Sequence, residues 1–183
     1  MFDDADLLGA AQRSDPGALG QIFDLHAPAL YRYAVRLCHD ATEADQIVGD
    51  VFAHLVEQLA AGGGPRSNLR AYLYQIAYHV LVDHTRQASR VSPMEEAANL
   101  PDGQPSVAGQ VEQSELMKEL EAAVTQGLTE EQQHVVVLRY VEGFSLQETA
   151  EITGKNINAV SVLQNRAIAR LRQLLQAKPE EEK

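Results

Sequence analysis

Residues 145–175 carry the pattern that decides the fold, and they read SLQETAEITGKNINAVSVLQNRAIARLRQLL. Ser145 is a suitable N-cap, and Glu148 completes a capping box with it. Gly154 predicts the end of that short helix, because glycine readily takes a positive φ. Asn156 predicts the start of a second, longer helix. The stretch therefore predicts two helices joined by a tight turn, which is a helix-turn-helix.

The longer helix has two chemically different faces. Apolar residues recur at steps of three and four, which puts them on one buried stripe: Val160, Leu163, Ala167, Leu171 and Leu174. The opposite face carries groups that can contact base edges and phosphates: Asn158, Ser161, Val162, Asn165, Arg166 and Arg172. The corner of an ordinary helical bundle has the same periodicity, so the pattern alone leaves DNA binding and simple packing equally open.

A second predicted helix, residues 69–86, mixes aromatic and basic residues. It follows a glycine-rich break at residues 60–65 and is capped by Asn68. Unstacked bases bind aromatic rings and arginines, and the aromatic groups found here among arginines are Tyr72, Tyr74, Tyr78 and His79. Tyrosines on amphipathic helices are more often half-buried packing residues. By itself, this pattern favours packing over strand binding.

The N-terminal part of the chain predicts further amphipathic helices. One covers residues 42–59, with Thr42 at its start and a broad apolar band along its length. The residues that lie away from most of this band, as on a solvated face, are Asp45, Gln46, Gly49, Asp50 and His54. Cys38 is predicted to pack as a small apolar residue, since its position next to His39 does not suit a metal site.

Charge is distributed unevenly along the chain, whose net charge is −11. Residues 1–60 carry a balance of −7 and residues 93–127 one of −6, whereas residues 61–92 carry +3 and residues 128–183 carry −1. The total argues against indiscriminate nucleic-acid binding, because phosphates repel an acidic chain. The two less acidic stretches are locally suited to DNA, and the acidic ones fit either a basic partner or solvated faces.

Several functional classes lack support in the sequence. No apolar run approaches the roughly 20 residues needed to cross a bilayer, so we expect no membrane insertion. The acidic start MFDDADLLGA does not resemble a signal peptide, and the single cysteine cannot form an internal disulfide, which together favour the cytoplasm. We find no phosphate-binding loop, paired metal motif or nucleophile signature, and therefore expect no catalytic residue, metal or cofactor.

Residues 128–175 resemble region 4 of sigma-70-family RNA polymerase initiation factors, most closely the extracytoplasmic-function (ECF) type. The matching residues are Leu128, Val137 to Tyr140, Gly143 to Ser145, Glu148 to Ala150, Val160, Arg166, Ala167, Leu171 and Arg172. The resemblance implies contact with the −35 element through Lys155, Asn158, Ser161, Val162, Asn165 and Arg166. The family commonly has lysine where Ser161 stands and often arginine where Leu163 stands, so we expect this chain to depend more on short polar and apolar base contacts.

Residues 45–52 resemble the region 2 segment of the same family that docks on the clamp helices of the polymerase β′ subunit. The resemblance implies that the polymerase-binding residues are Asp45, Gln46, Gly49 and Asp50. The family more often has a polar residue where Gly49 stands. A glycine in the middle of a helix costs about 1 kcal/mol relative to alanine, and it offers no side chain to a partner.

Residues 69–86, with the Asn68 cap, resemble the region 2 helix that contacts the −10 element and traps the opened strand. The implied DNA-binding residues are Arg66, Asn68, Arg70, Tyr72, Tyr74, Tyr78, His79, Asp83 and Arg86. The family usually has tryptophan where Tyr72 stands and Arg-Asn where Tyr78 and His79 stand. The glycine-rich loop, residues 61–67, falls where the family places its base-capturing loop.

The resemblance thus implies an all-α protein of two small helical domains on a flexible linker. We expect a region 2-like domain at 1–90, an acidic linker at 91–113, a region 4-like domain at 114–178 and a charged tail at 179–183. The implied function is promoter-specific initiation, with core RNA polymerase (β′ clamp helices and β flap), promoter DNA and an anti-sigma factor as partners of a chain that is monomeric when free. Two alternatives remain open: a helix-turn-helix regulator that acts without polymerase, and a sigma-like interaction protein that does not initiate transcription.

Overall fold

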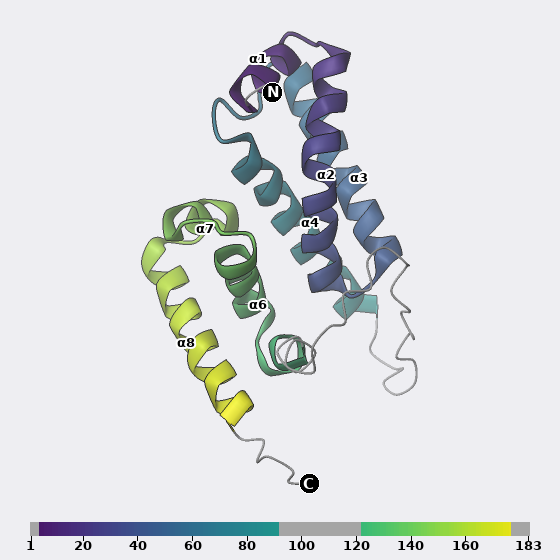
Figure 1. Ribbon diagram of the computed structural model, residues 1–183. Helices are drawn as coiled ribbons and strands as arrows, with labels where there is room; N and C mark the ends of the chain where they lie inside the picture. Colours follow the sequence, from purple (N-terminus) through teal and green to yellow (C-terminus); the bar gives the residue numbers. More distant parts are fainter. Residues whose placement is uncertain (1–3, 92–121, 177–183) are drawn as a thin grey trace, which may run out of the picture. The chain divides into compact units, whose positions relative to one another are not determined.

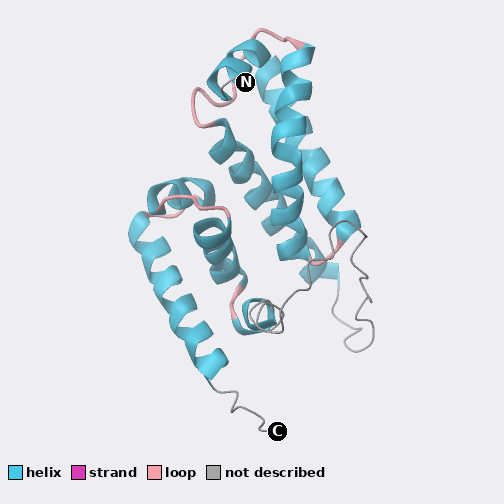
Figure 2. Cartoon of the chain, viewed as in Figure 1, coloured by secondary structure: helices cyan, strands magenta, loops and turns pink. Residues whose placement is uncertain are grey.

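The computed structural model describes residues 4–91 and 122–176, with side chains for 4–86 and 122–176. Every regular element in these ranges is helical (Figure 2). In the N-terminal part (Figure 1) these are α1 (Asp4–Gln12), α2 (Pro16–Cys38), α3 (Ala41–Ala60) and α4 (Leu69–Val91). In the C-terminal part, residues 122–127 are helical and are followed by α6 (Glu130–Val136), the π-helical turn η1 (Val137–Val141), α7 (Leu146–Thr153) and α8 (Ile157–Gln176).

The chain divides into two compact units, which confirms the predicted fold of two helical domains. The predicted linker, 91–113, lies outside the described residues except for its first residue, and the predicted tail, 179–183, lies entirely outside them. The start of the predicted C-terminal domain, 114–121, is also outside them.

Local capping residues set the ends of the N-terminal helices. The Asp15 carboxylate accepts a hydrogen bond from the Gly17 backbone N–H at 2.8 Å, and Pro16 occupies the first turn of α2. The Asp40 carboxylate accepts one from the Glu43 N–H at 2.8 Å. Helix α3 therefore begins at Ala41, one residue before the predicted start at Thr42, because Asp40 supplies the cap.

The core of the N-terminal unit lies where α2, α3 and α4 pack together, with α1 against α2 (Figure 1). Its largest fully buried side chains are Ile22, Leu30, Tyr33, Ile47, Leu55, Leu69, Leu73 and Tyr74. The rings of Tyr33 on α2 and Tyr74 on α4 are 5.1 Å apart between centroids. This burial of apolar surface holds the helices together and fixes which face of α4 turns outward.

The C-terminal unit is small and has two neighbouring apolar clusters. One contains Leu128, Val136, Ala167 and Leu171, and the other contains Val135, Ala150 and Val160. The predicted stripe of α8 thus lies inward, with Leu163 and Leu174 half-buried at its margins. Because α8 contributes to both clusters, its opposite face is turned away from the core.

Candidate nucleic-acid interface

The helix-turn-helix is built by local hydrogen bonds that the sequence predicts. The Ser145 hydroxyl accepts from the Glu148 backbone N–H at 3.1 Å, and the Glu148 carboxylate accepts from the Ser145 N–H at 2.8 Å. This reciprocal pair is a complete capping box at the start of α7. The first helix of the motif therefore begins at a fixed residue.

The turn between α7 and α8 also matches its prediction. Gly154 has a φ of 65°, a conformation that favours glycine. The Lys155 N–H donates to the Ala150 carbonyl at 3.0 Å, and the Asn156 side chain accepts from the Ala159 N–H at 2.8 Å. These bonds close α7 and start α8, so the two helices meet at a defined turn.

Arg139 of η1 ties the motif together across the chain. Its Nε donates to the Gln164 Oε1 of α8 at 3.0 Å, and its Nη1 donates to the Phe144 carbonyl just before α7. One guanidinium thus fixes both helices of the motif, as its fork of donors allows. The sequence did not reveal this role of Arg139, because Gln164 lies 25 residues further along the chain.

The outward face of α8 carries the residues predicted to contact the −35 element. Exposed on it are Asn158, Val162, Asn165 and Arg166, with Ser161 half-buried beside them and Arg172 exposed about two turns further on. Val162, which is 47% exposed, adds an apolar group to this face. The face offers amide, guanidinium and apolar groups of the kinds that bind base edges in a major groove.

Lys155, which is predicted to contact the −35 element, is paired with a carboxylate in the structure. Its ammonium forms an ion pair with the Glu131 carboxylate of α6 and is itself half-buried. A phosphate that contacts Lys155 must therefore compete with Glu131. The sequence did not reveal this partner, since the two residues lie on different helices.

His134 of α6 is buried beneath this ion pair, with 2% of the residue exposed. Burial lowers the pKa of His134 to about 4; the nearby Lys155 also lowers it, and Glu131 opposes both effects. The imidazole is therefore neutral at pH 7. A neutral buried histidine behaves as a core residue and provides no charge for DNA.

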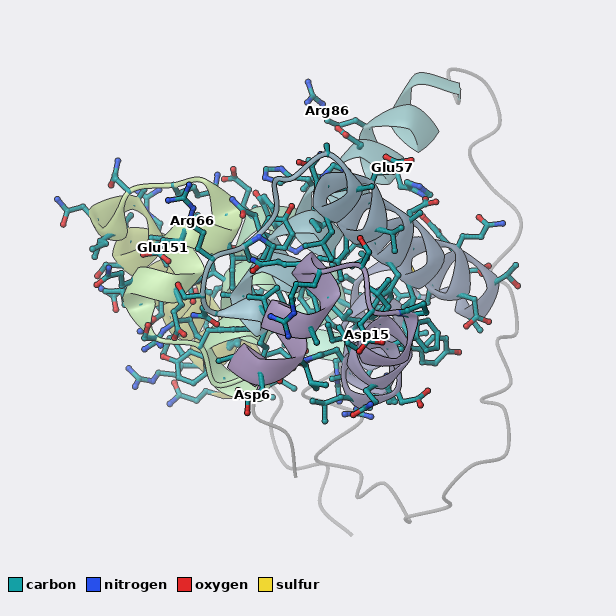
Figure 3. All side chains as sticks on the ribbon, turned by 90° about the horizontal axis from the view of Figure 1, so that it is seen from above. Asp6, Asp15, Glu57, Arg66, Arg86 and Glu151 are labelled. Atoms are coloured by element: carbon teal, nitrogen blue, oxygen red, sulfur yellow. The ribbon has the colours of Figure 1, made fainter. Side chains whose placement is uncertain are left out.

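Helix α4 presents a second candidate surface. Tyr72, His79, Asp83 and Arg86 recur at steps of seven, four and three and share one face, with Tyr72 half-buried and the other three exposed. Arg86 projects from the ribbon in Figure 3. Burial raises the pKa of Tyr72, so its hydroxyl stays protonated and can donate a hydrogen bond.

Tyr74 and Tyr78 lie elsewhere on the same helix, and their burial argues against the predicted contact with the opened strand. Tyr74 is 1% exposed and Tyr78 7% exposed. The Arg70 guanidinium lies 5.2 Å from the centre of the Tyr74 ring, so Arg70 also faces the packed side, in a cation–π contact. The structure separates these three residues from the Tyr72 face, because α2 covers the side of α4 on which Tyr74 lies.

The loop before α4 provides two further predicted DNA-binding residues, and both are accessible. Arg66 and Asn68 are exposed. Asn68 also caps α4, since its side-chain oxygen accepts from the Ala71 N–H at 3.2 Å. The loop and the first turn of α4 are thus continuous with the Tyr72 face.

Helix α3 carries the residues predicted to bind polymerase on its outward face. Asp45, Gln46, Gly49 and Asp50 are all exposed. Next to them lie two exposed apolar side chains, Phe23 of α2 and Val56 of α3. The centroid of the Phe23 ring is 4.8 Å from that of the Phe52 ring. Exposed apolar groups beside acidic ones are typical of a surface that another protein covers.

Gly49 leaves open space on this face, which leads to a prediction for stability. A Cβ added at Gly49 would meet no atom within 4 Å outside its own helix backbone. We expect Gly49→Ala to raise the free energy of unfolding by about 0.5–1 kcal/mol, because alanine has the higher helix propensity. Urea denaturation followed by tyrosine fluorescence measures this. A lower stability would mean that the glycine is required for the backbone of α3.

No described helix is long and apolar enough to cross a membrane. Among the described residues, no group of three His, Cys, Asp or Glu side chains is arranged to hold a metal ion.

Comparison with known proteins identifies both domains. Residues 22–91 match sigma-70 region 2, and residues 126–173 match sigma-70 region 4. Among characterised relatives, the ECF RNA polymerase sigma factor BldN of Streptomyces coelicolor is 27% identical over 177 residues, which cover 93% of this chain and 65% of BldN. The ECF RNA polymerase sigma factor SigX of Bacillus subtilis is 25% identical over 166 residues, which cover 87% of this chain and 84% of SigX.

A solved structure gives the same answer for the fold. CnrH, in its complex with the cytosolic domain of CnrY, superposes with a TM-score of 0.69 at 25% identity, over 96% of this chain and 99% of CnrH. The region 2 match falls in the N-terminal helical unit described above, and the region 4 match falls largely in the C-terminal one. The chain belongs to the sigma-70 family of RNA polymerase sigma factors, and within that family to the ECF type.

Proposed function

We propose that this protein is a transcription initiation factor that binds core RNA polymerase and directs it to promoters. The observation that carries the proposal is the outward face of α8, which presents Asn158, Val162, Asn165 and Arg166 from a complete helix-turn-helix. A helix with that chemistry, held by its opposite side in a small domain, fits the major groove of a −35 element.

Strand opening at the −10 element is the second part of the proposed function. The exposed face of α4, with Tyr72, His79 and Arg86, follows directly from Arg66 and Asn68 in the preceding loop. Such groups stabilise a melted strand by stacking on bases and contacting phosphates. Opening then follows from preferential binding of the single strand, and the protein acts without catalytic residues, metal or cofactor.

The partners we propose follow from the two domains. The α3 face that contains Asp45, Gln46, Gly49 and Asp50 binds the β′ clamp helices of core polymerase, and the C-terminal domain binds near the β flap. We assign residues 1–90 and 114–178 to these domains, with 91–113 as the connection and 179–183 as a tail. The chain works where polymerase works, in the cytoplasm, and is a monomer when free.

We also propose that a regulatory protein binds the free chain. CnrH was solved in complex with the cytosolic domain of CnrY, and the RpoE protein of Bartonella quintana in complex with the anti-sigma factor NepR. Here the exposed Phe23 and Val56, together with the half-buried Phe52 and the exposed Asp45, form the surface best suited to such a partner. An anti-sigma factor that covered this surface would exclude polymerase from it.

Run-off transcription tests the function directly. Purified core polymerase with the full chain is expected to initiate at a subset of genomic fragments, while core polymerase alone does not. The free chain, with its net charge of −11, is expected to bind duplex DNA poorly in fluorescence anisotropy. Tight specific binding by the free chain without initiation would indicate a conventional helix-turn-helix regulator instead.

Substitutions on α8 test how the −35 element is recognised. We expect Asn165→Ala or Arg166→Ala to cost about 1–3 kcal/mol at particular base pairs and to relax the preference there. The measurement is transcription from a promoter library randomised at the −35 element. Gln176→Ala, at the far end of the same helix, is the control and should leave the preference unchanged. Unchanged preference in both test variants would show that α8 does not contact the bases.

The Lys155–Glu131 ion pair makes a separate prediction about salt dependence. We expect Lys155→Ala to weaken holoenzyme binding to all −35 sequences about equally and to reduce the salt slope by about one unit, as loss of one phosphate contact does. Glu131→Gln should strengthen binding, because Lys155 no longer has to leave a carboxylate. In the double variant that gain should vanish. A gain that persists without Lys155 would assign the effect of Glu131 to general repulsion of DNA.

A further inference from the structure

Helix α1 lies against the loop that joins α3 to α4, residues 61–68. The two segments line a common hollow, with Leu8, Gly9 and Gln12 on the α1 side and Ser67 and Asn68 on the loop side. The loop carries Arg66 and Asn68, which the proposed function places on the opened strand. The contacts that hold this loop therefore determine where Arg66 and Asn68 meet the opened strand.

A side chain of α1 is hydrogen-bonded to this loop at Pro65. The Gln12 Nε2 donates a hydrogen bond to the Pro65 carbonyl at 2.9 Å, across 53 residues of sequence. Pro65 is buried, and its ring fixes its own φ. Holding that carbonyl therefore sets the direction in which the chain leaves toward Arg66.

Hydrogen bonds also hold the two ends of the loop, and at its far end the Asn68 side chain caps α4. Its first half is anchored through the backbone, where the N–H groups of Gly62 and Gly63 donate to the carbonyls of Leu59 and Gln58 at 3.0 and 2.8 Å. Gly64 has a φ of 93° and no side chain to pack. A glycine-rich segment loses more conformational freedom on ordering than other segments do. The Gln12 contact thus holds the loop at Pro65, between the glycines that follow α3 and the Asn68 cap of α4.

Helix α1 is itself firmly attached, so it can serve as a support. Its own residues Leu7, Leu8 and Ala11 are buried. Near its start, the Asp4 carboxylate lies 3.3 Å from the His26 Nε2 of α2. Gln12, at the last position of α1, extends from this fixed helix to the loop.

We propose that Gln12 is a positioning residue for capture of the −10 strand: by holding the Pro65 carbonyl, it places Arg66 and Asn68 for contact with the opened DNA. The proposal rests on the proposed function, since it assigns a role within −10 recognition. Gln12 acts through the loop, so its loss should affect binding of melted DNA and leave recruitment to core polymerase unchanged.

The test uses holoenzyme assembled from core polymerase and the full chain, with a promoter fragment taken from the run-off experiment. Its −10 segment is either fully paired or held open by mismatches, and dissociation constants are measured for both. Gln12→Met keeps the size of the side chain and removes the donor, while Gln12→Lys restores a donor. Gln21→Met and Gln21→Lys, at an exposed glutamine of α2, control for composition and for added charge.

We expect Gln12→Met to weaken binding to the mismatched promoter by about tenfold, which is within the range for loss of one captured base. Gln12→Lys should bind within about twofold of wild type after correction by Gln21→Lys, and core binding should stay unchanged throughout. Wild-type affinity in Gln12→Met would overturn the proposal, as would an equal loss in Gln12→Lys. A parallel loss of core binding would make the role merely structural and would also overturn it.

These results are distinguishable from failure of the proposed function. If the protein does not open promoters, wild-type holoenzyme itself shows no preference for the mismatched fragment over the paired one. If the protein opens promoters but Gln12 has no role in it, wild-type holoenzyme and the Gln12→Met variant both prefer the mismatched fragment to the same extent.

Discussion

Replacing Tyr74 with alanine is expected to lower the free energy of unfolding of the N-terminal domain by about 3–5 kcal/mol, the usual cost of removing a buried aromatic ring. The ring is 1% exposed, lies 5.1 Å from the Tyr33 ring and supports the Arg70 guanidinium. Its loss leaves a cavity at the contact between α2 and α4. The domain should remain folded only with reduced stability.

Tyrosine fluorescence during urea denaturation measures this loss selectively. The protein has no tryptophan, and five of its six tyrosines (31, 33, 72, 74 and 78) precede residue 79, so the signal reports mainly on the N-terminal domain. Tyr72→Ala is the matched control on the same helix. Because Tyr72 is half-buried, its removal should cost less stability but about 1–3 kcal/mol of binding to the opened strand.

The reverse pattern would contradict this assignment. If Tyr74→Ala left stability unchanged and abolished permanganate reactivity at the −10 element, the ring would leave the core to stack on DNA. If Tyr72→Ala had no effect on opening, the outward face of α4 would not contact the strand.

Lowering the pH from 7 to 4 is expected to destabilise the C-terminal domain by about 3 kcal/mol through His134 alone. Burial lowers the pKa of His134 from 6.5 to about 4, so the folded domain holds the imidazole neutral while the unfolded chain protonates it. The stabilisation is fully present above pH 6.5 and is lost progressively as the pH falls toward 4. The loss has a simple cause, since a charged imidazole is poorly solvated at this buried position.

His134→Leu provides the control because it packs without titrating. Carboxylates also titrate below about pH 5, but they do so in both proteins, so the difference between the two pH profiles isolates His134. Amide hydrogen exchange in α6 and η1 follows the C-terminal domain, and NMR titration of the imidazole gives its pKa directly. A pKa near 6.5, or identical profiles, would mean that water reaches the ring.

Helix ends and the outward face of α8 followed from the sequence. The capping box of Ser145 and Glu148, the turn at Gly154 and the cap at Asn156 are made by residues within a few positions of one another. Such contacts depend on local backbone geometry and residue type, which the sequence states directly. Val160, Ala167 and Leu171 lie on one side of α8 and are buried. Their spacing in the sequence therefore also predicted which face of α8 is exposed.

The interface on α4 needed the tertiary structure. Its apolar and aromatic residues surround much of the helix, so the period did not choose between Tyr72 and Tyr74 as the outward ring. Tyr74 is the buried ring because α2 packs on its side of α4, where Tyr33 lies against it. The sequence likewise did not predict two contacts: the ion pair of Lys155 with Glu131 and the hydrogen bond from Gln12 to Pro65. Each joins residues far apart in the chain, and only the packing of the helices brings their side chains within reach.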